Sequence, residues 1–397
     1  MSWPTCWPRD WPRKARPEPG LNILVLGGYG NFGARICKAL ANTPGIALIV
    51  AGRDGRKALA LADSLHAQSA VVDIDDPALA ATLQALGAGL VIHTAGPFQQ
   101  QGYKVAQAAA EAGAHYIDLA DGRRFVCDFP AQLDAAFRAR GRIGISGASS
   151  VPSLSSAVVD HLCAGWRSID TIDTCIAPAQ TAPRGVATMA AVLGYCGAPI
   201  EVWQDGLWAT RYGWAAPTRV TYARLRPRLA ALCDIPDLEL FPAHYKGVRS
   251  VMFRAALEIG ISQRGLAAIG ALRRIGLVRR PERYAAFLNR AAGLLDPFGS
   301  ALGGMVVRVT GSGADGAPVT RAWHLAADHD HGPEIPCMAA IILARRLAAG
   351  GIAQVGACTA TGMLALAEFA PQFAQWGIVT DIVDEQVKQH PDEHRQR

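Results

Sequence analysis

The feature that most constrains the fold is a strand–turn–helix pattern in residues 21–40. An apolar run at 23–26 leads into glycines spaced G-x-G-x-x-G, and a helical pattern of apolar residues follows directly. Such glycines permit a tight turn, a close approach of backbone N–H groups to a pyrophosphate, and close packing of the helix on the strand. A glycine turn can also be purely structural, but the flanking strand and helix favour a dinucleotide site. The residues expected to bind the cofactor here are Gly28, Tyr29, Gly30, Asn31, Phe32 and Gly33.

The end of the second apolar run, at 46–50, indicates which nucleotide binds. Ala51-Gly52-Arg53-Asp54 follows it, at the position where a site for NAD usually places Asp or Glu against the ribose. Arginine instead offers a planar, permanently charged group that suits a 2′-phosphate. We therefore expect NADP(H) to be favoured over NAD(H), with Arg53 as the phosphate reader. The alternative is that Arg53 is a solvated residue at a helix start, and Asp54 can cap that helix in either case.

Six short β-rich runs alternate with helical patterns through the first 150 residues. This alternation predicts an α/β fold, a Rossmann-type doubly wound parallel sheet over residues 21–150. Because parallel strands end at one edge of the sheet, the polar and glycine-rich segments after them should converge on one crevice. We expect Asp73 to contact the adenine or to cap a helix, and Thr94, Ala95 and Gly96 to line the cofactor. Asp118 is a candidate base or hydrogen-bond anchor, although buried carboxylates at strand ends are often structural.

The pattern changes after residue 150, where strands pair through hairpins and long loops. We expect a second α+β domain with a mixed or antiparallel sheet over 151–332, serving substrate binding and dimerisation. Helices over 333–384 should pack back on the first domain, and 1–20 and 385–397 should be tails. Polar residues of the second domain are candidate substrate anchors, each of which is also compatible with a solvated surface position: Arg184, Arg211, Tyr245, Lys246 and Arg249.

Composition excludes several classes of protein. The net charge of +6 is mild, and no zinc-finger spacing or dense basic block appears, so nucleic acid is not expected as a partner. Nine cysteines without a C-x-x-C pair favour reduced thiols and a cytoplasmic setting. The one metal candidate, 328–331, is expected to be a polar loop, so no metal site is predicted. The sequence contains no apolar run long enough to predict a membrane span. The basic amphipathic segment 265–280 either packs on protein or lies on a membrane surface.

The motifs together resemble the saccharopine dehydrogenase (saccharopine reductase-like) NADP-binding family, most strongly over residues 20–155. They are Gly27-Gly28-Tyr29-Gly30-Asn31-Phe32-Gly33, Ala51-Gly52-Arg53, His93-Thr94-Ala95-Gly96-Pro97-Phe98, Tyr116-Ile117-Asp118-Leu119 and Ser146-Gly147-Ala148-Ser149-Ser150-Val151-Pro152. The resemblance implies that the glycine loop holds the pyrophosphate, that Arg53 meets the phosphate of the adenosine end, and that 94–96 line the cofactor. It also implies a site between two domains that reduces an imine or oxidises an amine, commonly in a homodimer.

The function expected from these observations is hydride transfer between NADP(H) and a C=N or C=O group of a small substrate. The cofactor carries the chemistry, and the protein supplies orientation and a proton. Candidate proton donors are Asp118, His244 and Tyr245. Two alternatives stay open, a nonenzymatic NADP(H)-binding sensor and a membrane-associated reductase that uses the basic segment.

Overall fold

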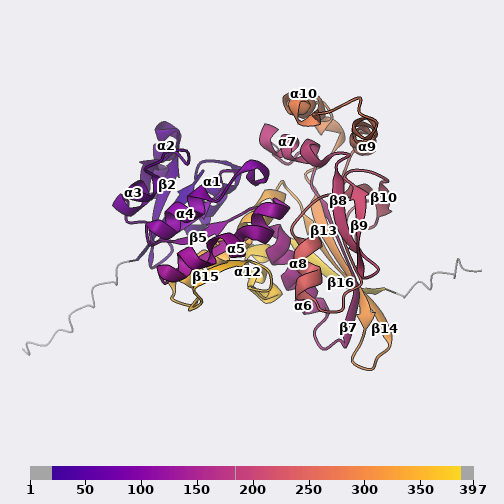
Figure 1. The fold of residues 1–397 in the computed structure, drawn as a ribbon. Coiled ribbons are helices and arrows are strands. Elements are labelled where there is room, and N and C mark those ends of the chain that lie inside the picture. Colours follow the sequence, from indigo (N-terminus) through magenta and orange to yellow (C-terminus); the bar gives the residue numbers. More distant parts are fainter. Residues whose placement is uncertain (1–19, 184, 386–397) are drawn as a thin grey trace, which may run out of the picture.

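Two β-sheets, joined side by side, form the body of the molecule (Figure 1). The structure is a computed structural model, and it describes residues 20–183 and 185–385. The segments predicted as tails lie outside the described residues except for residues 20 and 385, and the candidate anchor Arg184 lies outside them as well.

The first sheet is parallel throughout, in the strand order β15-β6-β5-β4-β1-β2-β3. Its strands are β1 (Leu21–Leu26), β2 (Ile46–Gly52), β3 (Gln68–Val71), β4 (Leu90–His93), β5 (His115–Asp118), β6 (Ile143–Ser146) and β15 (Gly356–Thr359). Its helices are α1 (Asn31–Leu40), α2 (Gly55–Leu65), α3 (Leu79–Ala85), α4 (Lys104–Glu111) and α5 (Arg123–Ala139). The predicted Rossmann-type sheet is confirmed, and the order 3-2-1-4-5-6 of its first six strands is that of dinucleotide-binding folds.

Aromatic side chains fill the space between α5 and this sheet. Phe129 and Phe137 of α5 are fully buried, and the Phe129 ring stacks on that of Tyr116 in β5 with centroids 5.7 Å apart. Gly144 of β6 lies under Phe137, where an added Cβ would stand 2.5 Å from the ring. The helix therefore packs against β5 and β6 through large rings, which makes the position of the β5 and β6 ends rigid.

The second sheet is mixed, as expected. Its main path is β10-β11-β12-β7-β13-β14-β16, and β8 and β9 form a hairpin attached to β12. Only the β7–β12 pair is parallel. The strands are β7 (Ser168–Ala177), β8 (Pro199–Gln204), β9 (Leu207–Tyr212), β10 (Thr218–Val220), β11 (Arg228–Leu232), β12 (Ser250–Leu257), β13 (Gly303–Ser312), β14 (Pro318–Ala327) and β16 (Val379–Glu385).

Helices cover the second sheet in two groups. Figure 1 shows α7 (Val186–Tyr195), α9 (Gly260–Arg274) and α10 (Ala285–Gly293) at one end of the sheet, with α7 on the side toward α1. The helices α6 (Ser155–Leu162) and α8 (Asp237–His244) lie between the two sheets. Among the helices of residues 20–183 and 185–385, none has the length and apolar character needed to cross a membrane.

The C-terminal segment is divided between the sheets. The helix α11 (Ile335–Ala348) packs beside α1, where the Arg35 guanidinium pairs with Glu334 at 2.8 Å. The strand β15 then extends the first sheet, and β16 extends the second. The segment 333–384 was expected to be helical, but after α11 it contains only a 3-10 turn at Leu366–Glu368 and the short α12 (Ala370–Gln375) besides the two strands. The glycine at 362 has a φ of +69°, which a helix does not accommodate.

Arg123, the first residue of α5, links the helices of the first sheet to residues of the second sheet and its helices. Its guanidinium, only 9% exposed, pairs with Asp234 at 3.1 Å and with Glu239 at 3.0 Å, and it donates to the carbonyl of Glu201 at 2.7 Å. All three partners belong to the second half of the molecule. Because several groups hold one shielded guanidinium, the contact fixes how the sheets approach each other near the end of β5.

Replacing Phe129 by alanine tests the aromatic packing. We expect Phe129→Ala to lower the free energy of unfolding by about 3–5 kcal/mol, because it removes a fully buried ring from between α5 and β5. The matched control is Phe287→Ala, which truncates a ring that is 68% exposed and should change stability by less than about 0.5 kcal/mol. Urea unfolding followed by circular dichroism measures both variants, and equal losses would contradict this account of the core.

Candidate functional site

The glycine loop connects β1 to α1 through a tight contact of the loop backbone with the helix. Gly27 has a φ of +74°, a conformation that favours glycine. A Cβ at Gly33 would lie 2.2 Å from the Gly27 carbonyl oxygen, so α1 could not approach the loop this closely with any other residue there. The sequence motif identified Gly33 but missed Gly27, whose signal was the doubled glycine directly after the apolar strand.

Thr94 holds this loop from the neighbouring strand. Its hydroxyl donates to the carbonyl of Leu26 at 2.8 Å and lies 3.3 Å from that of Gly27. The Gln101 amide donates to the Ala95 carbonyl at 2.7 Å, which keeps the segment after β4 in place. Thr94 therefore supports the loop through its side chain, while Ala95 and the exposed Gly96 present backbone beside it.

The first turn of α1 offers its backbone N–H groups to the crevice. Gly30 is the N-cap, no side chain caps the helix, and the first turn contains no acidic residue. Asn31 is exposed and Phe32 is half-buried, and the Asn31 amide oxygen accepts from Arg35 at 2.8 Å. Uncapped N–H groups together with the positive end of the helix dipole suit a phosphate group.

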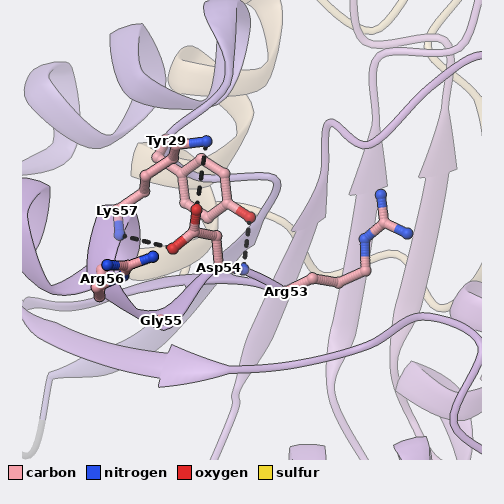
Figure 2. A pocket seen from close by; sticks show the side chains of 6 residues that line it. All are labelled: Tyr29, Arg53, Asp54, Gly55, Arg56 and Lys57. Carbon is pink, nitrogen blue, oxygen red and sulfur yellow. Dashed lines mark hydrogen bonds and ion pairs between the residues drawn. The ribbon is translucent and has the colours of Figure 1, made fainter.

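A basic pocket of about 840 Å³ lies at the end of β2 (Figure 2). It is lined by Tyr29, Arg53, Asp54, Gly55, Arg56 and Lys57. The Tyr29 ring covers Gly52, where an added Cβ would stand 2.5 Å from a ring carbon, and the Tyr29 hydroxyl accepts from the Asp54 N–H at 2.9 Å. The glycine loop and the end of β2 are thus joined through one tyrosine.

The carboxylate in this pocket is already engaged. Asp54 caps α2 by accepting from the Lys57 N–H at 3.2 Å, and it pairs with the Lys57 ammonium at 3.2 Å. These contacts, the backbone hydrogen bond first, hold the pKa of Asp54 below its usual range. Figure 2 shows the Arg53 side chain extending away from Asp54 on the side opposite Arg56 and Lys57. Cations therefore flank the pocket on both sides, which fits an additional phosphate.

Arg56 and Lys57 are functional candidates that the sequence interpretation missed. Both stand at the start of α2, where the helix dipole disfavours positive charge. Two cations in the first turn of α2 are therefore a sequence signal for a bound anion, separate from the residue that ends the strand.

Asp73 is exposed and shapes a turn. Its carboxylate accepts from the Asp75 N–H at 3.0 Å, and α3 does not begin until Leu79, so Asp73 does not cap that helix. Lys104 binds the neighbouring Asp75, and this contact, assisted by the nearby charge of Arg53, lowers the pKa of the Asp75 carboxyl. Arg53 thus lies beside the turn that Asp73 organises.

Asp118 at the end of β5 is completely buried. One carboxylate oxygen accepts from the Gly147 N–H at 2.8 Å, the Ala120 N–H at 3.0 Å and the Ser146 hydroxyl at 3.0 Å. Burial raises the pKa of Asp118 to about 6, although these hydrogen bonds oppose the shift. The side chain ties the end of β6 to the segments that follow β5 and β6 at the crevice edge.

The other two proton-donor candidates lie elsewhere. The Tyr245 hydroxyl, at the end of α8, donates to the Ser156 carbonyl at 3.2 Å and lies 3.0 Å from a carboxylate oxygen of Asp160. His244 is exposed and lies against Tyr245 and the backbone at Gly362. Neither residue lines the basic pocket or the cavity described next. The same is true of the candidate anchors Arg211, Lys246 and Arg249.

A cavity of about 410 Å³ lies between the glycine loop and the helices at the end of the second sheet. Asn31 and Phe32 form its wall on one side, and residues from the end of β7, from α7, α9 and α10 form the other. This interdomain cavity adjoins the N-terminus of α1, and its volume lies within the range of small-molecule sites. The predicted site between two domains therefore has a matching space.

The described residues contain no group of three or more His, Cys, Asp or Glu side chains arranged to hold a metal ion. Within 328–331, the Asp330 carboxylate accepts from the Thr181 hydroxyl at 2.6 Å, and a ring nitrogen of His331 lies 2.9 Å from the Trp376 carbonyl. These side chains bind different partners.

Comparisons with known proteins support the resemblance. Residues 23–143 match the family model of the saccharopine dehydrogenase NADP binding domain. Apo saccharopine dehydrogenase (L-Glu forming) from Saccharomyces cerevisiae superposes with a TM-score of 0.68 at 13% identity, covering 92% of this chain and 100% of the other. Homospermidine synthase from Legionella pneumophila, solved with NAD, gives 0.58 at 9% identity over 95% of both chains. A comparison with curated protein sequences found no match. The predicted resemblance is confirmed, and at these identities the solved structures establish the fold.

The buried Asp118 predicts a specific pH dependence of stability. In the unfolded chain this carboxyl titrates near 3.8, whereas in the folded protein it titrates at about 6. The folded state binds more protons between these values, so the free energy of unfolding falls as pH rises through this window, by about 1–3 kcal/mol from this group. Asp118→Asn should remove this part of the fall, because an amide does not titrate.

Urea unfolding at a series of pH values from 4 to 7 measures the effect. The control is Asp63→Asn on the exposed side of α2, which should reproduce the wild-type curve. If wild type and Asp118→Asn gave parallel curves, Asp118 would not hold a raised pKa in the folded state.

Proposed function

We propose that this protein is an NADP(H)-dependent oxidoreductase that transfers a hydride between the nicotinamide and a C=N or C=O group of a small substrate held between the two sheets. The match of residues 23–143 to an NADP-binding family model supports the cofactor class. The fold is shared with a saccharopine dehydrogenase and with a homospermidine synthase that was solved in complex with NAD. The uncapped N-terminus of α1, directly after the glycine turn, supplies a place for the pyrophosphate.

The observation that carries the proposed preference for NADP(H) is the engagement of Asp54. A site for NAD needs a carboxylate free to accept from the ribose hydroxyls. The Asp54 carboxylate is instead bound to the backbone and side chain of Lys57. Arg53 and Arg56 are exposed on either side of it, so a 2′-phosphate would meet positive charge and no free carboxylate.

When bound, the nicotinamide supplies or accepts the hydride. The protein's residues hold and orient it. The backbone of 28–33 would bind the pyrophosphate. The Thr94 hydroxyl holds that loop against the end of β4. Ala95 and Gly96 would face the nicotinamide half of the cofactor. Asp118 fixes the loops after β5 and β6 and has no exposed atom, so we assign it positioning and not proton transfer. His244 and Tyr245 lie outside both the pocket and the cavity, and we propose no catalytic role for them.

A sensor that binds NADP(H) without turnover is the second candidate. It is favoured by one observation, that none of the three predicted proton donors presents a titrating atom to the cavity. Oxidation of NADPH in the presence of a panel of aldehydes, ketones and amine–aldehyde mixtures separates the two functions. Turnover with any member supports the oxidoreductase, whereas cofactor binding without turnover across the panel supports the sensor.

Cofactor binding provides the direct test of the preference. We expect NADPH to bind the wild-type protein at least about tenfold more tightly than NADH, a difference of about 1.4 kcal/mol, because the 2′-phosphate meets Arg53, Arg56 and Lys57. Arg53→Ala should weaken NADPH binding by about fivefold or more while leaving NADH within about twofold. Tryptophan quenching measures the affinities. The control is Arg140→Ala, an exposed arginine at the end of α5, which should behave as wild type. Equal affinities for the two cofactors in the wild type would contradict the role of Arg53.

A further inference from the structure

The walls of the interdomain cavity are apolar. Most of the lining is aliphatic or aromatic, with Met189, Val192, Leu266, Ile269 and Leu288 among its larger side chains. Among the described lining residues none is positively charged, and Glu258 is the one acidic side chain. A substrate that enters this cavity therefore meets mainly hydrocarbon.

Two polar side chains of the wall, Glu258 and Gln180, are engaged by the protein itself. The Glu258 carboxylate accepts from the Gln180 N–H and the Ser300 N–H, both at 3.1 Å, and from the Ser300 hydroxyl at 2.7 Å. It also lies 3.6 Å from the guanidinium of Arg228. The Gln180 side-chain amide donates to Asp296 at 2.9 Å and to the Ala292 carbonyl at 3.2 Å. These groups hold the wall together, and their charges and hydrogen bonds are used there.

One buried donor in the wall has no partner among the described residues. The indole N–H of Trp214, whose side chain is 1% exposed, makes no hydrogen bond there. A buried donor without a partner is costly to the fold. Trp214 borders the cavity, but its N–H is buried behind the wall, so the surface that a bound molecule meets there is the apolar part of the indole.

From these contacts we propose that the interdomain cavity binds an apolar carbonyl or imine compound, such as a medium-chain aldehyde or its imine, and not a charged amino acid. The inference rests on the proposed function and names its substrate class. A carboxylate or ammonium group placed against this wall would lose its hydration without gaining an ion pair from the described residues. An alkyl chain makes no hydrogen bonds to water that it could lose, and its removal from water into this cavity is favourable.

Competition for a neutral fluorescent probe tests the substrate class. The probe is 1-aminoanthracene, added to the full-length protein with saturating NADPH, and the competitors are decanal, L-lysine and L-glutamate. We expect decanal to displace the probe and the two amino acids to leave it bound. Displacement by either amino acid, or failure of the probe and decanal to bind, would overturn the proposal. NADPH binding is measured separately, so loss of cofactor binding would count against the proposed function and not against the cavity.

A cavity-filling variant locates the probe. Ala291→Phe places a ring in the cavity wall, and its matched control is Ala286→Phe on the exposed side of the same helix. We expect Ala291→Phe to weaken probe binding by at least about tenfold and the control to change it by less than about twofold. Equal effects would show that the probe binds elsewhere. If Ala291→Phe does not fold, the wild-type competition result alone still decides the substrate class.

The outer side of the helices that line this cavity carries an independent signal. Between residues 260 and 298 there are seven arginines and two acidic residues, a net charge of +5 in a chain whose total is +6. Large apolar side chains stand among them, between 68% and 77% exposed: Ile261, Ile275, Leu277, Phe287, Leu294 and Phe298. We call this surface, residues 260–298, the basic apolar cap. The predicted amphipathic segment 265–280 is part of it, and Ile275 within that segment is 71% exposed.

Charge decides what can cover the basic apolar cap. Two copies of the chain that met through it would bring two surfaces of net charge +5 together, which opposes a symmetric dimer through this face. A nucleic acid would neutralise the arginines but leave the large apolar side chains without a partner. An anionic lipid surface provides partners for both the arginines and the apolar side chains. The arginines meet the anionic headgroups, while the Phe and Leu side chains enter the boundary of the acyl chains.

We propose that the basic apolar cap docks on an anionic lipid surface. Because the same helices line the apolar cavity on their inner side, docking places the cavity next to the medium in which apolar carbonyl compounds dissolve. The docking proposal does not depend on the identity of the substrate, since it follows from the charge and exposure of the outer face.

Vesicle co-sedimentation tests the docking surface. We expect the full-length protein to sediment with vesicles containing equal parts phosphatidylcholine and phosphatidylglycerol, and to remain in solution with phosphatidylcholine alone. The triple variant Arg279→Gln, Arg280→Gln, Arg283→Gln should lose at least about tenfold of the anionic binding. The matched control changes Arg138 and Arg140 to Gln on α5, and its binding should stay within about twofold of wild type.

Docking would be overturned by equal sedimentation with both kinds of vesicle, or by unaltered vesicle binding of the triple variant. A change in the oligomeric state of that variant without a change in vesicle binding would overturn it too. Binding to a DNA duplex in place of the vesicles would likewise assign the cap to nucleic acid. Circular dichroism confirms that each variant is folded.

Discussion

The structure depends on how closely α1 approaches the end of β1. Gly27 turns the chain in a conformation that favours glycine, and Gly33 leaves out the side chain that would collide with the Gly27 carbonyl. Thr94 then fixes the loop from β4. Since α1 is held by this contact, its N-terminus, the basic pocket beside Tyr29 and the wall formed by Asn31 and Phe32 all take their positions from it.

Much of the first sheet could be predicted from the sequence because its strands are short apolar runs that end in glycine or polar residues. The family resemblance and the mixed second sheet were also predicted correctly. Site chemistry was less accessible. A cavity wall is assembled from segments far apart in the chain, here 178–192 and 257–295, and no local pattern shows that Leu266 faces it while Ile275 faces solvent. Arg211 and Lys246 were candidate substrate anchors because of their charge, whereas the described lining of the cavity contains no positively charged side chain.

Asp118 illustrates the same difference between residue type and environment. Its place at a strand end predicted a functional carboxylate or a hydrogen-bond anchor, and the structure shows that it accepts from the last residue of β6 and from the backbone just after β5 and β6. Asp54 is similar, since a carboxylate near the ribose position matters only if it is free. In both cases the partner of the side chain, which a single sequence does not reveal, decides the role.

The division of the C-terminal segment has a consequence for how this molecule is made. The chain completes six strands of the first sheet, builds most of the second, returns to add β15 to the first, and crosses again to add β16 to the second. The edge of β6 therefore stays uncovered until residues 356–359 have been synthesised and have paired with it as β15. A chain cut before residue 356 would lack β15 and β16 together, so each sheet would lose its outermost strand on that side.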